Sequence, residues 1–210
     1  MKLTLFSQNI TEKHINKLET YFHKPLAKVK FLYINTPGNY KPYKSEWMIK
    51  SERKWQNIFP KFQEFDIERA YRVDKNFDFK TYFESFDFIF ISGGNVFVLS
   101  YWMEKTGCRD ILKKLVEEGK VVYGGESSGA VYVYKDLEIY SAADEPKDAP
   151  AVVNDGLGFI DFAPIPHWEN EKFQSILEDI KKQFESKNVT TYTIEDNQAL
   201  FIATDKVQII

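Results

Sequence analysis

Residues 86–95 read Phe-Asp-Phe-Ile-Phe-Ile-Ser-Gly-Gly-Asn, an almost unbroken apolar run that ends in two glycines. A short continuous apolar run bounded by turn residues is typical of a strand buried on both faces of a sheet. Two other segments follow the same pattern. Residues 28–36 are followed by a Pro-Gly pair, and residues 120–123 are followed by a second Gly-Gly pair. These segments predict the central strands of a parallel sheet.

Amphipathic helices are predicted between the strands. Residues 171–185 carry apolar side chains at helical spacing, and residues 11–24 and 109–118 carry similar stripes, which we interpret as core-packing faces. Shorter strands are predicted at residues 2–6, 190–194 and 199–203. Strands that alternate with helices predict a three-layer α/β fold, with a mostly parallel central sheet and helices on both faces. The length of 210 residues favours one domain over residues 1–210.

The composition excludes several classes of protein. With 43% hydrophobic residues, 28% charged residues and a net charge of −3, the chain resembles neither a disordered nor a membrane protein. Its cationic residues are scattered among acidic ones, so no nucleic-acid partner is expected. The single cysteine, Cys108, cannot form an internal disulfide, and no secretion signal or membrane-length apolar run is evident. We therefore expect a cytoplasmic protein without a membrane partner.

The segment most suggestive of chemistry follows the third predicted strand. Residues 125–129 read Gly-Glu-Ser-Ser-Gly, the Gly-x-Ser-x-Gly pattern of a nucleophile elbow. Such a turn holds the central serine, Ser127, in a strained conformation with its hydroxyl exposed. The backbone N–H of Ser128 would then be one oxyanion donor. The alternative interpretation is a tight turn without catalytic function.

A serine nucleophile needs a base, and only three histidines are available. His14 and His23 fall on the first predicted helix among charged residues, so we expect both at the surface. His167 lies in an apolar segment and is the best candidate base. Cys108 has no histidine near it in sequence, and we expect a buried or unreactive thiol. No pair of His or Cys residues has zinc-ligand spacing.

The acid that would orient the imidazole is harder to choose. The loop at residues 141–148 and the segment after it contain several carboxylates, and composition does not distinguish among them. The candidates are Asp144, Glu145, Asp148, Asp155 and Asp161.

Three motifs together resemble the serine peptidase family of dipeptidase E (aspartyl dipeptidase) and cyanophycinase. Residues 91–99, Ile-Ser-Gly-Gly-Asn-Val-Phe-Val-Leu, are similar to the family's Gly-Gly-Asn-Thr-Phe-x-Leu. Residues 125–130, Gly-Glu-Ser-Ser-Gly-Ala, are similar to Gly-x-Ser-Ala-Gly-Ala. Gly-Leu-Gly at 156–158 and Pro-His-Trp at 166–168 are similar to the family's Gly-Leu-Gly and Pro-His-Phe stretch.

The resemblance implies a flavodoxin-like fold related to class I glutamine amidotransferases. It implies Ser127 as nucleophile and His167 as base. It also favours Asp144 as the acid, because residues 143–146 best match the family's Asn-Asp-Met-Pro stretch. Gly94 would supply the second oxyanion N–H, with Gly93 as the alternative.

Two further residues of these motifs are expected at the substrate site, together with Gly93. Asn95 would brace the Gly-Gly turn. Glu126 stands where dipeptidase E has Trp, and a carboxylate there would repel an acidic side chain or have a raised pKa. The resemblance requires no metal or organic cofactor.

The sequence thus predicts a serine peptidase that hydrolyses short peptides, acting as a monomer or homodimer. The alternatives are an esterase or amidase with non-peptide substrates, and a non-catalytic binding relative that retains the fold.

Overall fold

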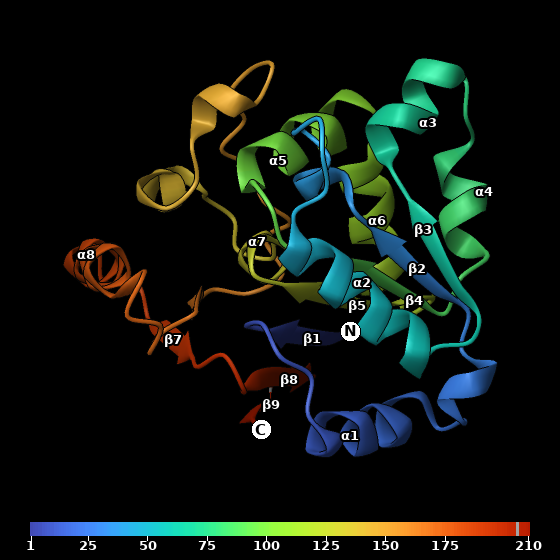
Figure 1. Cartoon of the computed structure of the whole chain (residues 1–210), viewed down its shortest axis with the longest axis horizontal. Coiled ribbons are helices and arrows are strands. Elements are labelled where there is room, and N and C mark those ends of the chain that lie inside the picture. Colours follow the sequence, from blue (N-terminus) through green and yellow to red (C-terminus); the bar gives the residue numbers. More distant parts are fainter. Residues whose placement is uncertain (205) are drawn as a thin grey trace.

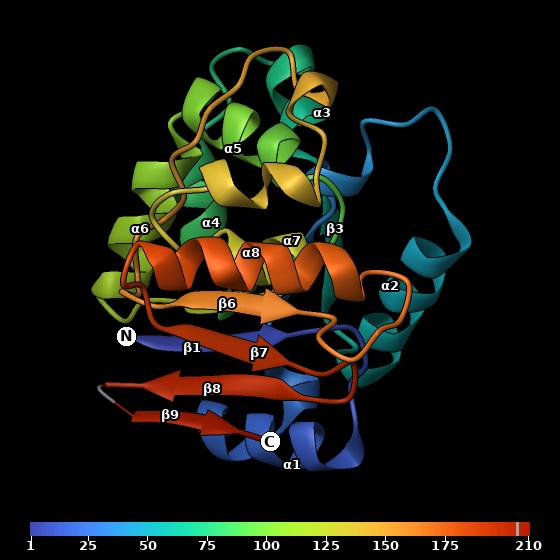
Figure 2. The same cartoon turned by 90° about the vertical axis from the view of Figure 1, so that its left-hand side faces the viewer.

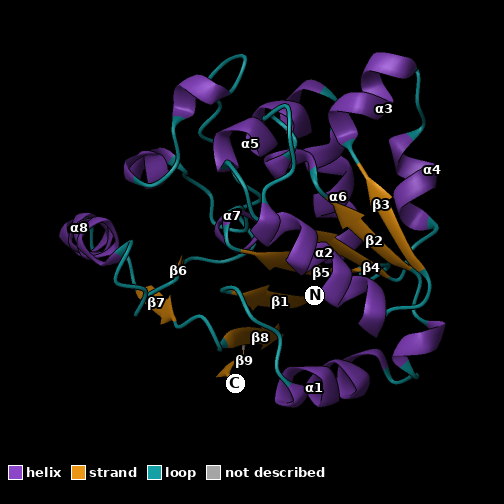
Figure 3. Ribbon diagram, in the orientation of Figure 1, coloured by secondary structure: helices purple, strands orange, loops and turns teal. Residues whose placement is uncertain are grey.

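The computed structural model describes residues 1–204 and 206–210 and contains a seven-stranded sheet in the order β3-β2-β4-β5-β1-β8-β9 (Figures 1 and 3). The first five strands in this order are parallel, β8 is antiparallel to β1, and β9 is antiparallel to β8. The strands are β1 (Lys2–Phe6), β2 (Phe31–Ile34), β3 (Phe62–Phe65), β4 (Phe88–Ile91), β5 (Val122–Glu126), β8 (Ala199–Ala203) and β9 (Lys206–Ile209). The predicted mostly parallel sheet is confirmed.

Helices cover both faces of this sheet, which confirms the three-layer α/β fold (Figure 1). The helices are α1 (Glu12–Phe22), α2 (Glu46–Ile58), α3 (Ile67–Val73), α4 (Phe79–Glu84), α5 (Val96–Lys105), α6 (Cys108–Glu117), α7 (Ser128–Val131) and α8 (Gln174–Ser186). Short 3-10 turns are η1 (Leu26–Lys28), η2 (Thr36–Gly38), η3 (Glu138–Ala142) and η4 (Pro146–Asp148). None of the helices in the described ranges combines the length and hydrophobicity needed to cross a bilayer.

The two faces of the sheet bury different side chains because neighbouring residues of a strand point to opposite faces. In β2, Phe31 and Tyr33 belong to a cluster that includes residues of α1 and, from α2, Trp55. Leu32 and Ile34 of the same strand belong to the larger cluster that includes residues of α4, α5 and α6. Aromatic side chains are thus packed against both faces of the sheet.

A second, two-stranded parallel sheet lies beside the main one, formed by β6 (Ala163–Pro166) and β7 (Thr191–Ile194). Helix α8 connects these strands and packs against both of them (Figure 2). The chain then passes through a turn at residues 195–198 into β8, which pairs with β1. The ends of β6 and β7 are therefore held close to the end of β1 and to the neighbouring β5.

His14 is an exception to the expected surface positions. It is fully buried, its Nδ1 accepts a hydrogen bond from the Thr11 N–H at 3.1 Å, and its Nε2 lies 2.9 Å from the Ile210 carbonyl oxygen. Burial lowers the pKa of His14. The prediction of a solvated residue was wrong because the ring closes the N-terminal cap of α1 beneath the C-terminal strand.

Candidate active site

Ser127 occupies a sharp turn between the end of β5 and the start of α7. Its φ is 51° and its ψ is −114°, a conformation that costs a non-glycine residue roughly 1–3 kcal/mol. The flanking glycines make the turn possible. A Cβ on Gly125 would lie 2.3 Å from the Gly129 carbonyl carbon, and a Cβ on Gly129 would lie 2.2 Å from the Ile91 carbonyl oxygen. The backbone therefore has room for this bend only with glycine on both sides.

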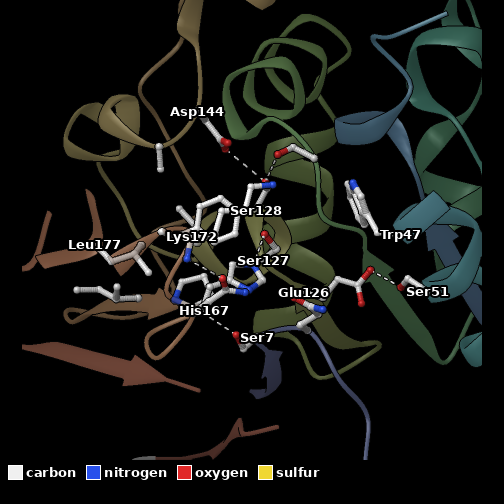
Figure 4. Close-up of a pocket in the computed structure, with 18 of the residues that line it drawn as sticks. Ser7, Trp47, Ser51, Glu126, Ser127, Ser128, Asp144, His167, Lys172 and Leu177 are labelled. Atoms are coloured by element: carbon white, nitrogen blue, oxygen red, sulfur yellow. Dashed lines mark hydrogen bonds between the residues drawn. The ribbon is translucent and has the colours of Figure 1, made fainter. Parts of the chain in front are cut away.

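His167 follows β6 and faces Ser127 (Figure 4). Its Nε2 lies 3.0 Å from the Ser127 Oγ. Its backbone also has a positive φ, of 64°, and its N–H donates to the buried Ser7 Oγ at 2.7 Å. The structure thus brings together the two residues that the sequence proposed as nucleophile and base.

The carboxylate that contacts the imidazole is Asp196, in the turn between β7 and β8. Its Oδ1 lies 2.8 Å from the His167 Nδ1. The Ser7 hydroxyl donates to the same oxygen at 3.3 Å, and the Asn170 side-chain amide donates to Oδ2 at 3.1 Å. A carboxylate can only accept a hydrogen bond, so the imidazole proton lies on Nδ1. Nε2 is then free to accept a hydrogen bond from the Ser127 hydroxyl.

The prediction that Asp144 orients the imidazole was therefore wrong. The Asp144 Oδ2 accepts from the Val96 N–H at 2.9 Å and lies 3.4 Å from the Ser128 Oγ, at the start of α5. Asp196 occupies the position beside His167 because β7 pairs with β6, so the turns that follow the two strands meet. Within the described residues, none of the other acids considered makes a hydrogen bond to His167 (Glu145, Asp148, Asp155 and Asp161).

The Gly93–Asn95 turn is held next to Ser127 by several contacts. Gly94 has a φ of 149°, and a Cβ there would lie 2.0 Å from the Pro37 carbonyl oxygen. The Asn95 N–H donates to that oxygen at 2.8 Å, and its side-chain amide donates to the Glu145 carbonyl at 2.8 Å. The Ser128 hydroxyl donates to the Gly94 carbonyl at 2.6 Å. Gly94 and Ser128 both line the cavity that contains Ser127.

A sequence model of peptidase family S51 matches residues 3–210. The chain belongs to this family. Curated relatives include an uncharacterized peptidase of Listeria innocua, 31% identical over 122 residues, which are 58% of this chain and 57% of the relative. Another is an uncharacterized peptidase of Listeria monocytogenes, 33% identical over 122 residues, 58% of each protein. The matched segment thus spans little more than half the length of these relatives.

Solved structures show the same fold. A Listeria monocytogenes EGD-e protein with a peptidase E designation superposes with a TM-score of 0.80 at 24% identity, covering 100% of this chain and 97% of the other. A peptidase from an acI-B1 Actinobacterium gives a TM-score of 0.66 at 16% identity, covering 100% and 86% of the two chains. Together with the family match, these similarities confirm the resemblance to the dipeptidase E family.

Glu126, the residue before Ser127 in this S51 chain, is 4% exposed and points toward α2. Its carboxylate accepts from the Tyr33 hydroxyl at 3.2 Å, from the Ser51 hydroxyl, and from the Trp55 indole N–H at 3.4 Å. Burial raises the pKa of Glu126. Glu126 lines the cavity, but the three donors tie its carboxylate to the protein.

Gly93, also expected at the substrate site, lies between Ser127 and α2. A Cβ on Gly93 would lie 3.1 Å from the Ser127 Cβ and 3.2 Å from the Trp47 ring. A larger residue there would narrow the space beside Ser127.

Asp144 has an unusual electrostatic environment for a surface loop. Burial is the main cause that raises the pKa of its carboxyl group from 3.8 to about 6. The folded protein therefore binds this proton more tightly than the unfolded chain does. Any stability that Asp144 contributes in its neutral form is complete below pH 4 and is lost as the pH rises to about 6.

Sequence reasoning missed Asp196, Ser7 and Asn170. The only available signal for Asp196 was its place between two predicted strands, at the position where polar residues of parallel sheets converge.

Cys108 is fully buried and burial raises its pKa to about 12, which disfavours the thiolate. The described residues contain no cluster of acidic, His and Cys side chains that could hold a metal ion.

Proposed function

We propose that this S51 protein is a serine peptidase that hydrolyses short peptides through Ser127, His167 and Asp196. The observation that carries the proposal is the continuous series of contacts, 3.0 Å from the Ser127 Oγ to the His167 Nε2 and 2.8 Å from Nδ1 to Asp196. A cavity of about 570 Å³ opens at Ser127, a volume that suits a small ligand.

In this mechanism the Ser127 hydroxyl attacks the scissile carbonyl while His167 takes its proton at Nε2. The Asp196 carboxylate stabilises the imidazolium that forms. The protonated Nε2 then gives its proton to the leaving amine, and the acyl group stays on the Ser127 Oγ. A water molecule, deprotonated by the same imidazole, releases the acid and restores the hydroxyl.

The tetrahedral intermediates need donors for the oxyanion. We assign this role to the backbone N–H groups of Ser128, at the start of α7, and Gly94, in the braced turn. Each well-placed donor stabilises the transition state by roughly 3 kcal/mol. The contacts of Asn95 and of the Ser128 hydroxyl would keep these groups fixed during the reaction.

Covalent labelling and hydrolysis together test the proposal. A fluorophosphonate should label Ser127, and the protein should hydrolyse members of a dipeptide panel. Ser127→Ala should lose both activities and remain folded with nearly unchanged thermal stability. Hydrolysis of acyl esters but not of peptides would favour an esterase or amidase, and an unlabelled but folded protein would favour a non-catalytic relative. Turnover that survives in Ser127→Ala would remove this residue from the mechanism.

A further inference from the structure

The cavity at Ser127 has two chemically different sides (Figure 4). On the side of α2, it is bordered by Trp47, Ser51 and Glu126, with two lysines of the same helix, Lys50 and Lys54. On the side of α8, its wall is apolar and comes from α7, η3, β6, α8 and the residue before α8. We call this wall the apolar lobe, formed by Val131, Tyr140, Ile165, Phe173, Leu177 and Ile180.

The apolar lobe is preformed by core packing. Ile165 and Ile180 are fully buried, and Leu177 is 6% exposed. The only polar side-chain atom of the lobe, the Tyr140 hydroxyl, donates to the Pro164 carbonyl at 2.9 Å. That hydrogen bond occupies the hydroxyl, so the lobe offers an incoming ligand an almost wholly hydrocarbon surface.

The lobe begins at the reaction centre. The Phe173 ring lies 5.6 Å from the His167 ring, centroid to centroid, and Val131 ends the short helix that follows Ser127. A group held in the lobe would therefore belong to a substrate residue that adjoins the bond under attack.

The charges around the cavity make the lobe unsuited to an acidic side chain. Lys50 pairs with Glu46 at 2.7 Å and Lys54 donates to Asn9 at 3.0 Å, both on the α2 side. Lys172 is exposed at the rim, with its Nζ 5.4 Å from the Phe173 centroid. Asp144 also lines the cavity and would repel a second carboxylate. A carboxylate inside the lobe would be removed from water without a cation in the lobe itself.

We propose that the apolar lobe binds a large apolar side chain, of the size of Leu or Phe, from the substrate residue next to the scissile bond. The proposal rests on the peptidase function proposed above. It names the chemical class of substrate that the site selects: short peptides with an apolar rather than an acidic residue at that position.

Labelling tests the lobe without requiring peptide turnover. The reagents are a fluorophosphonate with an octyl chain and one with a polyether chain of equal length, and the measurement is the rate of Ser127 modification by intact mass spectrometry. We expect the octyl reagent to react about tenfold faster or more, the usual range of discrimination in an apolar pocket. Equal rates would overturn the apolar lobe while leaving the nucleophile in place. Absence of labelling by either reagent would instead refute the proposed function and, with it, this inference.

Two neighbouring alanines provide a matched pair of variants. Ala142 and Ala143 are both exposed, but only Ala143 lines the cavity. The Ala143 N–H donates to the carbonyl of Tyr140, a lobe residue, at 2.9 Å. Ala143→Trp should therefore obstruct the cavity beside the lobe and remove most of the octyl advantage, whereas Ala142→Trp should retain it. An octyl advantage that is unchanged in Ala143→Trp would place the apolar site elsewhere and contradict the proposal.

Peptides then test the substrate class directly. Two sets of dipeptides place Leu, Phe, Asp or Lys before the scissile bond or after it. At one of these two positions, kcat/KM should be about tenfold higher for Leu and Phe than for Asp or Lys. Ala143→Trp should reduce this preference and Ala142→Trp should not. A preference for Asp, or no preference on either side, would overturn the proposal even if the enzyme is an active serine peptidase.

Discussion

Replacing Asp196 with Asn tests which carboxylate orients the catalytic imidazole. The Asp196 Oδ1 faces His167 and Ser7, and its Oδ2 faces the amide of Asn170. An Asn side chain has one oxygen and one NH2 group, so it cannot accept on both sides. If its NH2 faces Asn170, two donors oppose each other. If its NH2 faces His167, the ring must carry its proton on Nε2, which can then no longer accept the proton of Ser127.

The magnitude follows from the role and exposure of Asp196. Loss of the acid from a buried triad lowers kcat by roughly 10,000-fold. The Asp196 side chain is 26% exposed, so water compensates part of the lost charge. We therefore expect kcat to fall by about 1000-fold, or about 4 kcal/mol. The assay is steady-state dipeptide hydrolysis, with a thermal melt to establish that the variant is folded.

Asp144→Asn is the matched control for this prediction. The Asn oxygen can still accept the Val96 N–H, which the Asp144 carboxylate accepts at 2.9 Å. We expect a loss of less than about tenfold in kcat, since one hydrogen bond at the oxyanion turn is kept. A folded Asp196→Asn variant within tenfold of the wild-type kcat, or a larger loss in Asp144→Asn, would refute the assignment.

Three further predictions concern stability. Asp144→Asn should raise the free energy of unfolding by about 3 kcal/mol at pH 8, and by little below pH 4, because only the charged form is penalised by burial. Urea titrations at both pH values measure the difference, and a gain independent of pH would contradict it. The free energy of unfolding of Ser127→Gly should be about 1 kcal/mol higher than that of Ser127→Ala, because glycine tolerates the positive φ. Equal melting curves for the two variants would show that the turn is unstrained. Gly129→Ala should lower the free energy of unfolding by about 3 kcal/mol or more, because the new Cβ clashes with the Ile91 carbonyl. Gly107→Ala, with nothing within 4 Å of the new Cβ, should lower it by only about 1–2 kcal/mol because of its positive φ. Similar losses for the two variants in denaturant melts would argue against the packing described for the bend.

The central strands could be predicted because their side chains are buried on both faces. β2 and β4 are short apolar runs followed within three residues by Pro or Gly, so the local pattern identifies them. β5 was found by the same pattern, but it extends through the Gly-Gly pair that was predicted to follow it and ends at Glu126. β3 lacked such a signal, since Phe62–Phe65 is an edge strand with two exposed polar residues and is stabilised by its pairing with β2. Local sequence carries little information about a strand whose stability comes from its neighbour.

Ser127 and His167 could be singled out from the sequence for a different reason. The space around Ser127 demands glycine on both sides, which leaves a pattern in the sequence, and His167 was the one histidine outside the first helix. Asp196 left no pattern of its own. Its position depends on the parallel pairing of β6 with β7, which sets two turns 29 residues apart side by side. The similarity of the Asp144 loop to a family motif pointed to Asp144 by its place in the sequence. The acid that orients the imidazole must instead lie next to His167 in space, and that residue is Asp196.

The most direct test of the central claim is the low-field proton NMR signal of the His167 Nδ1–H, in protein labelled with nitrogen-15 at histidine. A hydrogen bond from this group to a carboxylate at 2.8 Å protects the proton from exchange and shifts its resonance downfield. The signal should be present in the wild-type protein and in Asp144→Asn, and absent from Asp196→Ala, because the Ala side chain offers no acceptor to Nδ1–H. A signal that persists unchanged in Asp196→Ala, or disappears in Asp144→Asn, would contradict the arrangement of Ser127, His167 and Asp196 described here.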